Sequence, residues 1–479
     1  MPRPSRIALA VPIPSCGGWA ARAPRRCLLA LITLLAGVAV PLLAQEGELD
    51  TTFQSAGLYH HHPDNVSDPV RVLAAPDGAL VFVAHAFFPG DVGGNDFWKR
   101  IADHAAGADC FVTGTDIPSF FVADARFDRL GRLLLVGSDP DNDRIVVFRY
   151  SYPTCDRDDS FGTNGVAVFS SSSWSEERGV AILERRYGTL FPSYAYFVLA
   201  ENGGTLTAPR GAVLLKLDEV GDLWSGWGNG LGWINHSFLP DVTRPIGLEL
   251  DGAARLVIGL EALRSGSSGH DFAAARVIAT DGALDPAFSS DGYVRIPIDA
   301  DGANSDDLPL GLATGTDSRV ALVGKAPDGS GIPRPTLVVL TSAGALDSSF
   351  AGDGKRQLPG QGQAWGARLL ADGKMVVVGQ GVDLLFRDES RIRRLLASGA
   401  DDPDFGVSGS AVFDPLDFGN GDDGARSVVV VGGKVVVAGW GEETPGHRNA
   451  YLMRFTSSTP ASLLPFVDGF ESGDLGAWD

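Results

Sequence analysis

The sequence predicts an all-β protein, a seven-bladed β-propeller of four-stranded antiparallel blades. Three observations point to this class. A short phrase returns about every 60 residues, β-branched runs fill the intervals, and 61 glycines and 29 prolines accompany almost no helical periodicity. Units of this size must stack on one another to bury their faces, and a closed ring leaves fewer open sheet edges than a linear solenoid. We therefore expect a propeller.

The recurring phrase is Leu-Asp-x-x-Phe-x-x-x-Gly. Three copies keep all four residues, and two more keep Asp, Phe and Gly. Two intervals are about twice as long as the others, and degenerate copies fill them. The seven predicted anchor residues are therefore Phe53, Phe111, Phe161, Trp227, Phe288, Phe350 and Phe405.

Each residue type in the phrase has a predicted structural task. The Asp carboxylate can accept a hydrogen bond from the backbone N–H two residues on and close a turn. The aromatic ring can fill the space between neighbouring sheets, and Gly adopts backbone angles that other residues resist. We interpret the phrase as a structural corner and not as a binding motif.

Four strands are expected in each interval. A short apolar run follows the anchor Gly, as in residues 165–169, and a second run follows, as in 69–75. A hairpin comes next, because Asp77-Gly78 and Asp372-Gly373 separate β-rich segments. The fourth run alternates, as in residues 144–150.

The two ends of the repeat region are complementary. The chain opens with an anchor phrase and a strand near Leu58-Tyr59, and it closes with three strands, 425–430, 434–440 and 449–455. We predict that the strand near Leu58 pairs beside residues 451–455 as the outermost strand of the last blade. Such pairing closes the ring and removes an open edge.

The phrase, together with runs such as Asp372-Gly373-Lys374-Met-Val-Val-Val-Gly379, resembles the bacterial delta-60 repeat. The resemblance covers residues 48–456. It implies a propeller in an exported or surface protein, and it transfers no catalytic residues.

The ends of the chain carry export features. Arg22, Arg25 and Arg26 precede an apolar run, 28–40, that is short for a membrane span, so residues 1–44 are predicted to be a signal peptide. Residues 45–456 form the predicted propeller, and 457–479 a linker and tail. The tail contains Asp-Gly-Phe-Glu-Ser-Gly-Asp, which is similar to a short tail on exported bacterial proteins. It also resembles the opening strand of a jelly-roll domain. We expect a secreted, periplasmic or cell-surface protein.

The charge balance excludes two classes of partner. The chain carries 39 basic and 59 acidic residues, and five of the arginines lie in the first 44 residues. The remainder therefore has a net charge of about −25. Nucleic acid and anionic membrane surfaces are poor partners for such a chain. We expect a monomer that meets an extracellular protein or glycan.

Two cysteines remain after the predicted signal peptide, Cys110 and Cys155. In an oxidising compartment they are expected to form a structural disulfide. The bridge would close a loop worth about 3 kcal/mol or more in chain entropy. Two buried thiols are the alternative.

The search for catalytic and cofactor motifs is mostly negative. The sequence has no His-Glu-x-x-His and no Gly-x-Ser-x-Gly. His60, His61 and His62 alternate faces of a strand and cannot converge on a metal. The Gly419-x-Gly421-x-x-Gly424 phrase opens a strand and carries Asp422 and Asp423, which repel pyrophosphate. We predict no catalytic, cofactor-binding or transition-metal residues.

Acidic loops leave calcium as an open hypothesis. The densest set of oxygen ligands lacks the distal Glu of an EF-hand, and we favour solvated polar turns as the explanation. That set is Asp299, Asp301, Asn304, Asp306 and Asp307, with Gly302 at the turn. A second set is Asp139, Asp141, Asn142 and Asp143.

Two function classes remain open. The first is a non-catalytic binding or surface-structural propeller whose ligand is unknown. The second is an extracellular lyase or hydrolase that acts on a glycan at the central channel, which needs polar side chains converging from several blades. Trp224, Trp227 and Trp233 could form a sugar-stacking platform, but we favour aromatic packing between blades.

Overall fold

The computed structural model describes residues 46–457 except for short internal gaps. The gaps are 62–65, 88–94, 113–116, 118, 172–175, 189, 191, 204–210, 239, 265–268, 301, 303–304, 384–386, 414–421 and 445–446. All described residues belong to one compact unit, Ala44–Asp479. The predicted signal peptide and residues 458–479 lie outside the described residues.

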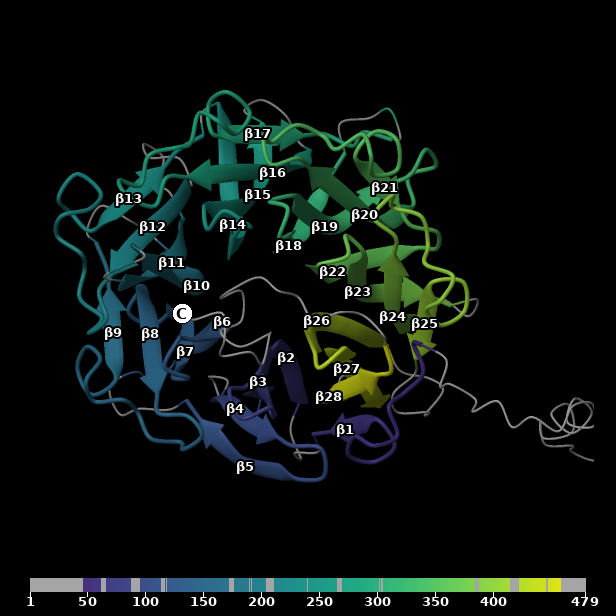
Figure 1. The fold of residues 1–479 in the computed structure, drawn as a ribbon, viewed down its shortest axis with the longest axis horizontal. Coiled ribbons are helices and arrows are strands. Elements are labelled where there is room, and N and C mark those ends of the chain that lie inside the picture. Colours follow the sequence, from purple (N-terminus) through teal and green to yellow (C-terminus); the bar gives the residue numbers. More distant parts are fainter. Residues whose placement is uncertain are drawn as a thin grey trace, which may run out of the picture. The chain divides into compact units, whose positions relative to one another are not determined.

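The described strands form seven four-stranded antiparallel sheets arranged in a ring (Figure 1). This confirms the predicted seven-bladed propeller. Blades 1 and 2 consist of β2 (Val66–Ala74), β3 (Leu80–Phe87), β4 (Asn95–Ile101) and β5 (Ala106–Phe111), then β6 (Phe121–Phe127), β7 (Leu133–Asp139), β8 (Arg144–Tyr150) and β9 (Val166–Phe169). Blades 3 and 4 consist of β10 (Arg178–Tyr187), β11 (Ser193–Asn202), β12 (Gly211–Leu217) and β13 (Trp233–His236), then β14 (Asp241–Leu250), β15 (Leu256–Arg264), β16 (His270–Val277) and β17 (Tyr293–Ile296).

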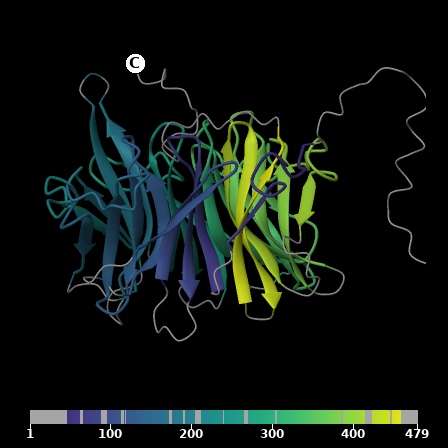
Figure 2. The same ribbon diagram turned by 90° about the horizontal axis from the view of Figure 1, so that it is seen from below.

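The remaining three blades repeat this order. Blades 5 and 6 consist of β18 (Leu308–Thr314), β19 (Val320–Pro327), β20 (Pro333–Leu340) and β21 (Lys355–Gln357), then β22 (Gly362–Leu369), β23 (Met375–Val382), β24 (Asp388–Leu395) and β25 (Ser410–Phe413). Blade 7 combines β26 (Asp423–Val431), β27 (Lys434–Thr444) and β28 (His447–Phe455) with β1 (Leu58–His60). Figure 2 shows the sheets from the side, with the turns gathered at two opposite faces.

Apolar side chains fill the spaces between neighbouring blades. One cluster joins blades 2 and 3 through Leu134, Val136 and Val198, and another joins blades 4 and 5 through Val257 and Leu322. Because both faces of a middle strand are covered, these strands read as continuous β-branched and aliphatic runs. The core therefore lies between the blades, and the innermost strand of each blade faces the centre of the ring.

The predicted ring closure is confirmed. Strand β1 pairs antiparallel with β28, with Leu58 opposite Met453, Tyr59 opposite Leu452 and His60 opposite Tyr451. An isolated bridge between Leu49 and Phe455 extends the contact. The last blade thus takes its outermost strand from the beginning of the repeat region.

The anchor phrases form the predicted turns between the third and fourth strands. In blade 4, Asp285 Oδ1 accepts a hydrogen bond from Ala287 N at 2.9 Å, and Phe288 is fully buried. The third strand adds a partner that the phrase does not contain. Arg276 Nε donates to Asp285 Oδ2 at 2.7 Å, and its guanidinium lies 4.9 Å from the centre of the Phe288 ring.

The same three-way contact recurs in other blades. Arg149 pairs with Asp158 beneath Phe161, Arg394 with Asp402 beneath Phe405, and Arg454 with Asp50 beneath Phe53. Burial alone raises the pKa of Asp50, but hydrogen bonds from Thr52 and the charges of Arg454 and Lys434 bring it down to about 2. Each of these four anchors is therefore an ionised Asp–Arg pair covered by an aromatic ring.

Consecutive anchor turns are linked by hydrogen bonds that run around the ring. Each donor belongs to one anchor turn. Five of the six acceptors follow the third strand of the next blade, and the sixth, Glu46, precedes the first anchor phrase and lies beside the end of β28. The bonds join Gly162 N to Val220 O, Trp227 Nε1 to Ala279 O, Ser289 N to Ala343 O, Ala351 N to Ser398 O, Gly406 N to Glu46 O and Gln54 N to Asp103 O, at 2.5–3.0 Å. We call this series the anchor belt.

The prediction of Phe111 as an anchor is wrong. Phe111 ends strand β5 and is 45% exposed, whereas blade 1 joins β4 to β5 through the short connection 102–105. The spacing required a seventh copy, but blade 1 lacks the turn. At this junction the predicted disulfide takes its place: Cys110 on β5 bonds to Cys155 after β8, with 5.4 Å between Cα atoms. The covalent bond thus links blades 1 and 2 where the anchor belt is interrupted.

Candidate functional site

Every innermost strand carries a β-bulge at the same level of the ring. The register shifts between Pro69 and Arg71 in blade 1, and equivalent shifts occur in the other six blades. A bulge leaves one residue outside the hydrogen-bond ladder and re-aims its side chain. The seven bulged residues all line the central channel: Val70, Ala123, Val180, Ile246, Leu310, Trp365 and Arg426.

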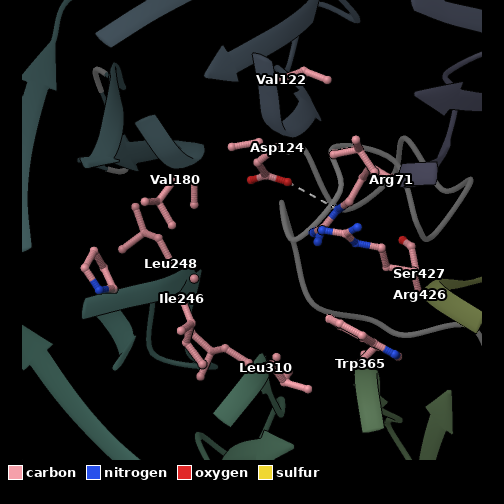
Figure 3. A pocket seen from close by; sticks show the side chains of 18 of the residues that line it. Arg71, Val122, Asp124, Val180, Ile246, Leu248, Leu310, Trp365, Arg426 and Ser427 are labelled. Atoms are coloured by element: carbon pink, nitrogen blue, oxygen red, sulfur yellow. Dashed lines mark ion pairs between the residues drawn. The ribbon is translucent and has the colours of Figure 1, made fainter. Parts of the chain in front are cut away.

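The channel contains a cavity of about 520 Å³ that is lined by the innermost strands of all seven blades. This volume lies within the usual range for small-molecule sites. The wall is mixed, because aliphatic bulge residues alternate with charged side chains from neighbouring positions (Figure 3). The cavity is the candidate functional site.

The charge of the channel differs in sign from that of the whole protein. Three acidic residues line the cavity: Asp124, Glu201 and Glu249. Six arginines line it as well: Arg71, Arg126, Arg178, Arg244, Arg368 and Arg426. The full chain has a formal net charge of −20. Arginine is thus concentrated at the centre of an acidic molecule.

One side of the channel is a closed ionic network. Arg126 Nη2 lies 2.6 Å from Glu249 Oε1, and Arg126 Nε lies 3.5 Å from Asp124 Oδ2. Arg71 Nε lies 3.4 Å from Asp124 Oδ1, as Figure 3 shows, and Arg71 Nη2 lies 3.7 Å from Glu249 Oε1. The network joins blades 1, 2 and 4, and its acids hold both arginines in place.

The other side presents an arginine beside an aromatic ring. The guanidinium of Arg426 lies 5.6 Å from the centre of the Trp365 ring, and Trp365 is half-buried. In Figure 3 the side chains of Arg71 and Arg426 extend into the same part of the channel. Arg178 and Arg426 are exposed, and neither has an ion-pair partner among the described residues. Desolvation by the surrounding channel wall lowers the pKa of the Arg426 guanidinium, while at longer range the carboxylate of Asp68 attracts it.

A ring of side chains lies on the second strands, each opposite the residue that precedes the start of a bulge, and three of its members, His85, Ser138 and Glu201, line the cavity. Its seven members are all polar or aromatic: His85, Ser138, Glu201, Glu261, Lys325, Gln380 and Trp440. His85 Nδ1 lies 2.6 Å from Asp96 Oδ1, and Asp96 Oδ2 also accepts the Val122 N–H. Burial raises the pKa of Asp96, although His85 partly opposes this.

The tryptophan platform does not form, and the preferred packing between blades is confirmed. Trp227 is buried, donates from Nε1 to Ala279 O at 3.0 Å and meets the Phe197 ring edge-on at 5.7 Å. Trp224 covers the Nζ of Lys216 at 4.2 Å from its ring centre. Both rings belong to the anchor turn of blade 3 and lie away from the channel residues.

The acidic loops divide into two kinds. In the first loop, Asp299 and Asp307 approach Asp271 of strand β16, whereas Asp306 accepts a hydrogen bond from His270 N at 3.2 Å. Burial raises the pKa of Asp307 to about 6, and Asp299 and Asp271 contribute to the rise. Asp301 and Asn304 lie outside the described residues.

The second loop is filled by protein groups. Arg144 and Asn142 bind the carboxylate of Asp139, and Asp143 accepts the backbone N–H groups of residues 176 and 177. His61 belongs to the histidine run that we did not expect to bind a metal. Its ring stacks on Phe97, with 4.7 Å between the ring centres. His62, Gly419 and Gly421 lie outside the described residues.

The chain matches no family model, and no curated protein matches it in sequence. Among solved structures, the α-L-arabinofuranosidase Arb93A from Fusarium graminearum is 10% identical with a TM-score of 0.38, over 74% of this chain and 98% of that one. The polysaccharide lyase Uly1 is 10% identical with a TM-score of 0.43, over 79% and 88%. An endo-arabinase from Bacteroides thetaiotaomicron is 13% identical with a TM-score of 0.30, over 70% and 92%. These distant likenesses concern the fold.

Among the described residues, no helix is long and apolar enough to cross a bilayer.

Proposed function

We propose that this protein is an exported, non-catalytic propeller that binds an anionic glycan in its central channel. The observation that carries the proposal is the excess of arginine over acid in the channel of an otherwise acidic chain. The acidic surface of the protein repels anions at a distance. Six arginines at the centre therefore support binding of an anion inside the channel. Guanidinium groups bind carboxylate and sulfate oxygens through paired hydrogen bonds.

The apolar part of the wall supports a sugar as the carrier of that charge. Trp365 offers an aromatic face beside Arg426, and Ile246 and Leu310 continue the apolar surface (Figure 3). A pyranose has apolar C–H faces and a polar edge, so it can lie on such a wall while its acidic group reaches an arginine. The ionic network of Arg71 and Arg126 forms the neighbouring part of the wall.

Export rests on two independent observations. The sequence has a signal-like N-terminus, and the Cys110–Cys155 bond is of the kind that persists in oxidising compartments. The resemblance to delta-60 repeats implies the same compartment. In that setting the partner is an extracellular or envelope glycan.

Titration calorimetry with the full mature chain tests the proposal. Oligouronates and sulfated oligosaccharides form two separate arms, and neutral oligosaccharides of equal length form the control. We expect an anionic arm to bind and to weaken as salt is added, because screening reduces charge–charge attraction. Equal binding of neutral and anionic sugars, or no binding in any arm, contradicts the proposal.

Variants locate the binding. Arg426→Ala removes an exposed channel guanidinium and is expected to weaken binding about tenfold, the worth of one charged hydrogen bond. The matched control is Arg100→Ala, which removes an arginine that pairs with Asp77 outside the channel. If both variants bind like the wild type, the ligand does not use the channel.

The His85–Asp96 pair favours a second candidate, a lyase or hydrolase acting on the same glycan. A carboxylate that orients a ring nitrogen is the arrangement that a histidine base needs. His85 lines the cavity, so it could take a proton from a bound sugar. Release of reducing ends from an oligouronate, lost in His85→Ala while binding persists, would replace the binding proposal by this one.

A further inference from the structure

Three carboxylates outside the channel converge on one point at the junction of blades 4 and 5. Asp271 lies on β16, and Asp299 and Asp307 lie in the segment that leads from β17 to β18. One oxygen from each lies within 4.8 Å of the others. Calcium binds oxygen at 2.3–2.6 Å, so two oxygens on one ion lie about 5 Å apart at most. The three groups can therefore share one ion.

Clusters of acids are common, but this one contains buried oxygens without partners. Asp307 is 0% exposed. Its Oδ2 accepts hydrogen bonds from Ile298 N at 2.6 Å and Asp299 N at 3.2 Å, whereas its Oδ1 has no hydrogen-bond partner among the described residues. Asp299 Oδ1 is likewise buried and has no hydrogen-bond partner among the described residues. A buried carboxylate oxygen in this state costs free energy unless a cation or a donor meets it.

Nearby side chains do not balance the charge. Among the described residues, Arg295 supplies the guanidinium of the cluster, donating from Nη1 to Asp271 Oδ2. The same side chain also faces a fourth acid, with Nε 3.8 Å from Asp241 Oδ2, which accepts the Tyr293 hydroxyl. Four carboxylates thus face one guanidinium. The second acidic loop differs, because Arg144 forms an ion pair with the carboxylate of Asp139.

We propose that Asp271, Asp299 and Asp307 bind one calcium ion. The ligands are all hard oxygen atoms, which suit calcium and not the softer transition metals. Two of the ligands come from the crossover between blades and one from a central strand, so the ion fastens this crossover to blade 4. The site is separate from the channel and does not depend on the proposed glycan.

Terbium luminescence and thermal melts of the full mature chain test the site. Tyr293 lies next to the cluster and can sensitise bound terbium. We expect one terbium per chain, displaced by calcium. Calcium at 100 times its Kd should also raise Tm by a few degrees relative to chelator, because the ion binds the folded chain. Equal melts in calcium and in chelator overturn the proposal.

Two variants and one control make the result specific. Asp299→Asn and Asp307→Asn should each abolish the calcium-dependent rise in Tm, whereas Asp281→Asn, an exposed turn acid of the same blade, should keep it. Asp299 is partly exposed, so its variant decides the question if Asp307→Asn does not fold. A calcium effect that persists in Asp299→Asn places the ion elsewhere and refutes this site.

Discussion

The anchor turns and the inner-strand bulges each recur around the ring, but they differ in how much their side chains vary. Four anchors repeat the same Arg–Asp–Phe contact, as in Arg276, Asp285 and Phe288. The bulges repeat a backbone geometry and carry side chains as different as Ala123 and Trp365. Side-chain chemistry is thus fixed where blades are joined, and it varies where the channel is lined.

The largest expected effect comes from removing the closure. Deletion of residues 48–62 removes β1, the Asp50–Arg454 pair and the buried ring of Phe53. We expect a loss above about 5 kcal/mol in unfolding free energy, since removal of a buried Phe and removal of one partner of a buried ion pair each cost about 3–5 kcal/mol. Urea unfolding measures the loss. Deletion of 458–479 is the control, and an equal effect of the two deletions contradicts the closure.

An anchor substitution and a channel substitution should separate stability from binding. Arg276→Ala leaves Asp285 without its partner and uncovers Phe288, so we expect a cost of about 3 kcal/mol. Arg178→Ala removes an exposed channel arginine and should change stability by less than about 0.5 kcal/mol while weakening anion binding. Chemical denaturation and calorimetry on both variants test the comparison. If Arg276→Ala keeps its stability while Arg178→Ala loses it, the assignment of stability to the anchors and of binding to the channel is wrong.

The disulfide junction should behave like an anchor. Cys110→Ser with Cys155→Ser removes the covalent link between blades 1 and 2, and we expect a loss of about 2–4 kcal/mol. Reduction of the wild type should lower its Tm to that of the double variant. If the double variant has the same Tm as the oxidised wild type, the disulfide does not stabilise this junction, and the contact of Trp98 with Tyr152 holds it instead.

The smallest effect concerns the aberrant anchor of blade 3. Trp224 replaces the anchor Asp, and burial together with the charge of Arg185 lowers the pKa of Lys216 to about 8. The unfolded chain, with a lysine pKa of 10.5, then holds more protons than the folded chain between these values. Stability should therefore rise with pH from about 8 toward 10. Lys216→Met should lack this rise, and identical pH profiles of stability would exclude the shift.

The sequence predicted the parts of the molecule that repeat. Phe288, Phe350 and Phe405 follow one phrase, so the blade number, the strand order and the closing strand were all predictable. Phe111 failed because spacing and a degenerate copy placed it: Asp109 precedes the ring by two residues instead of three, and it pairs with Lys99 Nζ at 2.9 Å instead of closing a turn. The arginines of the third strands recur in phase with the anchors, and that signal was missed.

The channel could not be read in the same way. The bulged residues share no side-chain type, and convergence across blades depends on three-dimensional closure. A weak signal exists, because Pro69, Pro245 and Pro309 precede three of the bulged residues, and Gly247, Gly311 and Gly366 follow three. Proline and glycine inside a strand mark interrupted ladders. Asp271 and Asp307 are likewise far apart in the sequence, and only the fold brings their carboxylates together.

The anchor belt gives each of blades 3 to 7 a donor on one side and an acceptor on the other. Blades therefore meet head to tail, like the subunits of a cyclic oligomer whose interface is heterologous. Such contacts either close into a ring or continue without end. In this protein the ring is closed by the pairing of β1 with β28 and by the Cys110–Cys155 bond. When β1 detaches from β28, blade 7 offers an unpaired edge, and β1 of a second copy has the sequence that fits it. We therefore expect opening of the closure to permit strand exchange between copies.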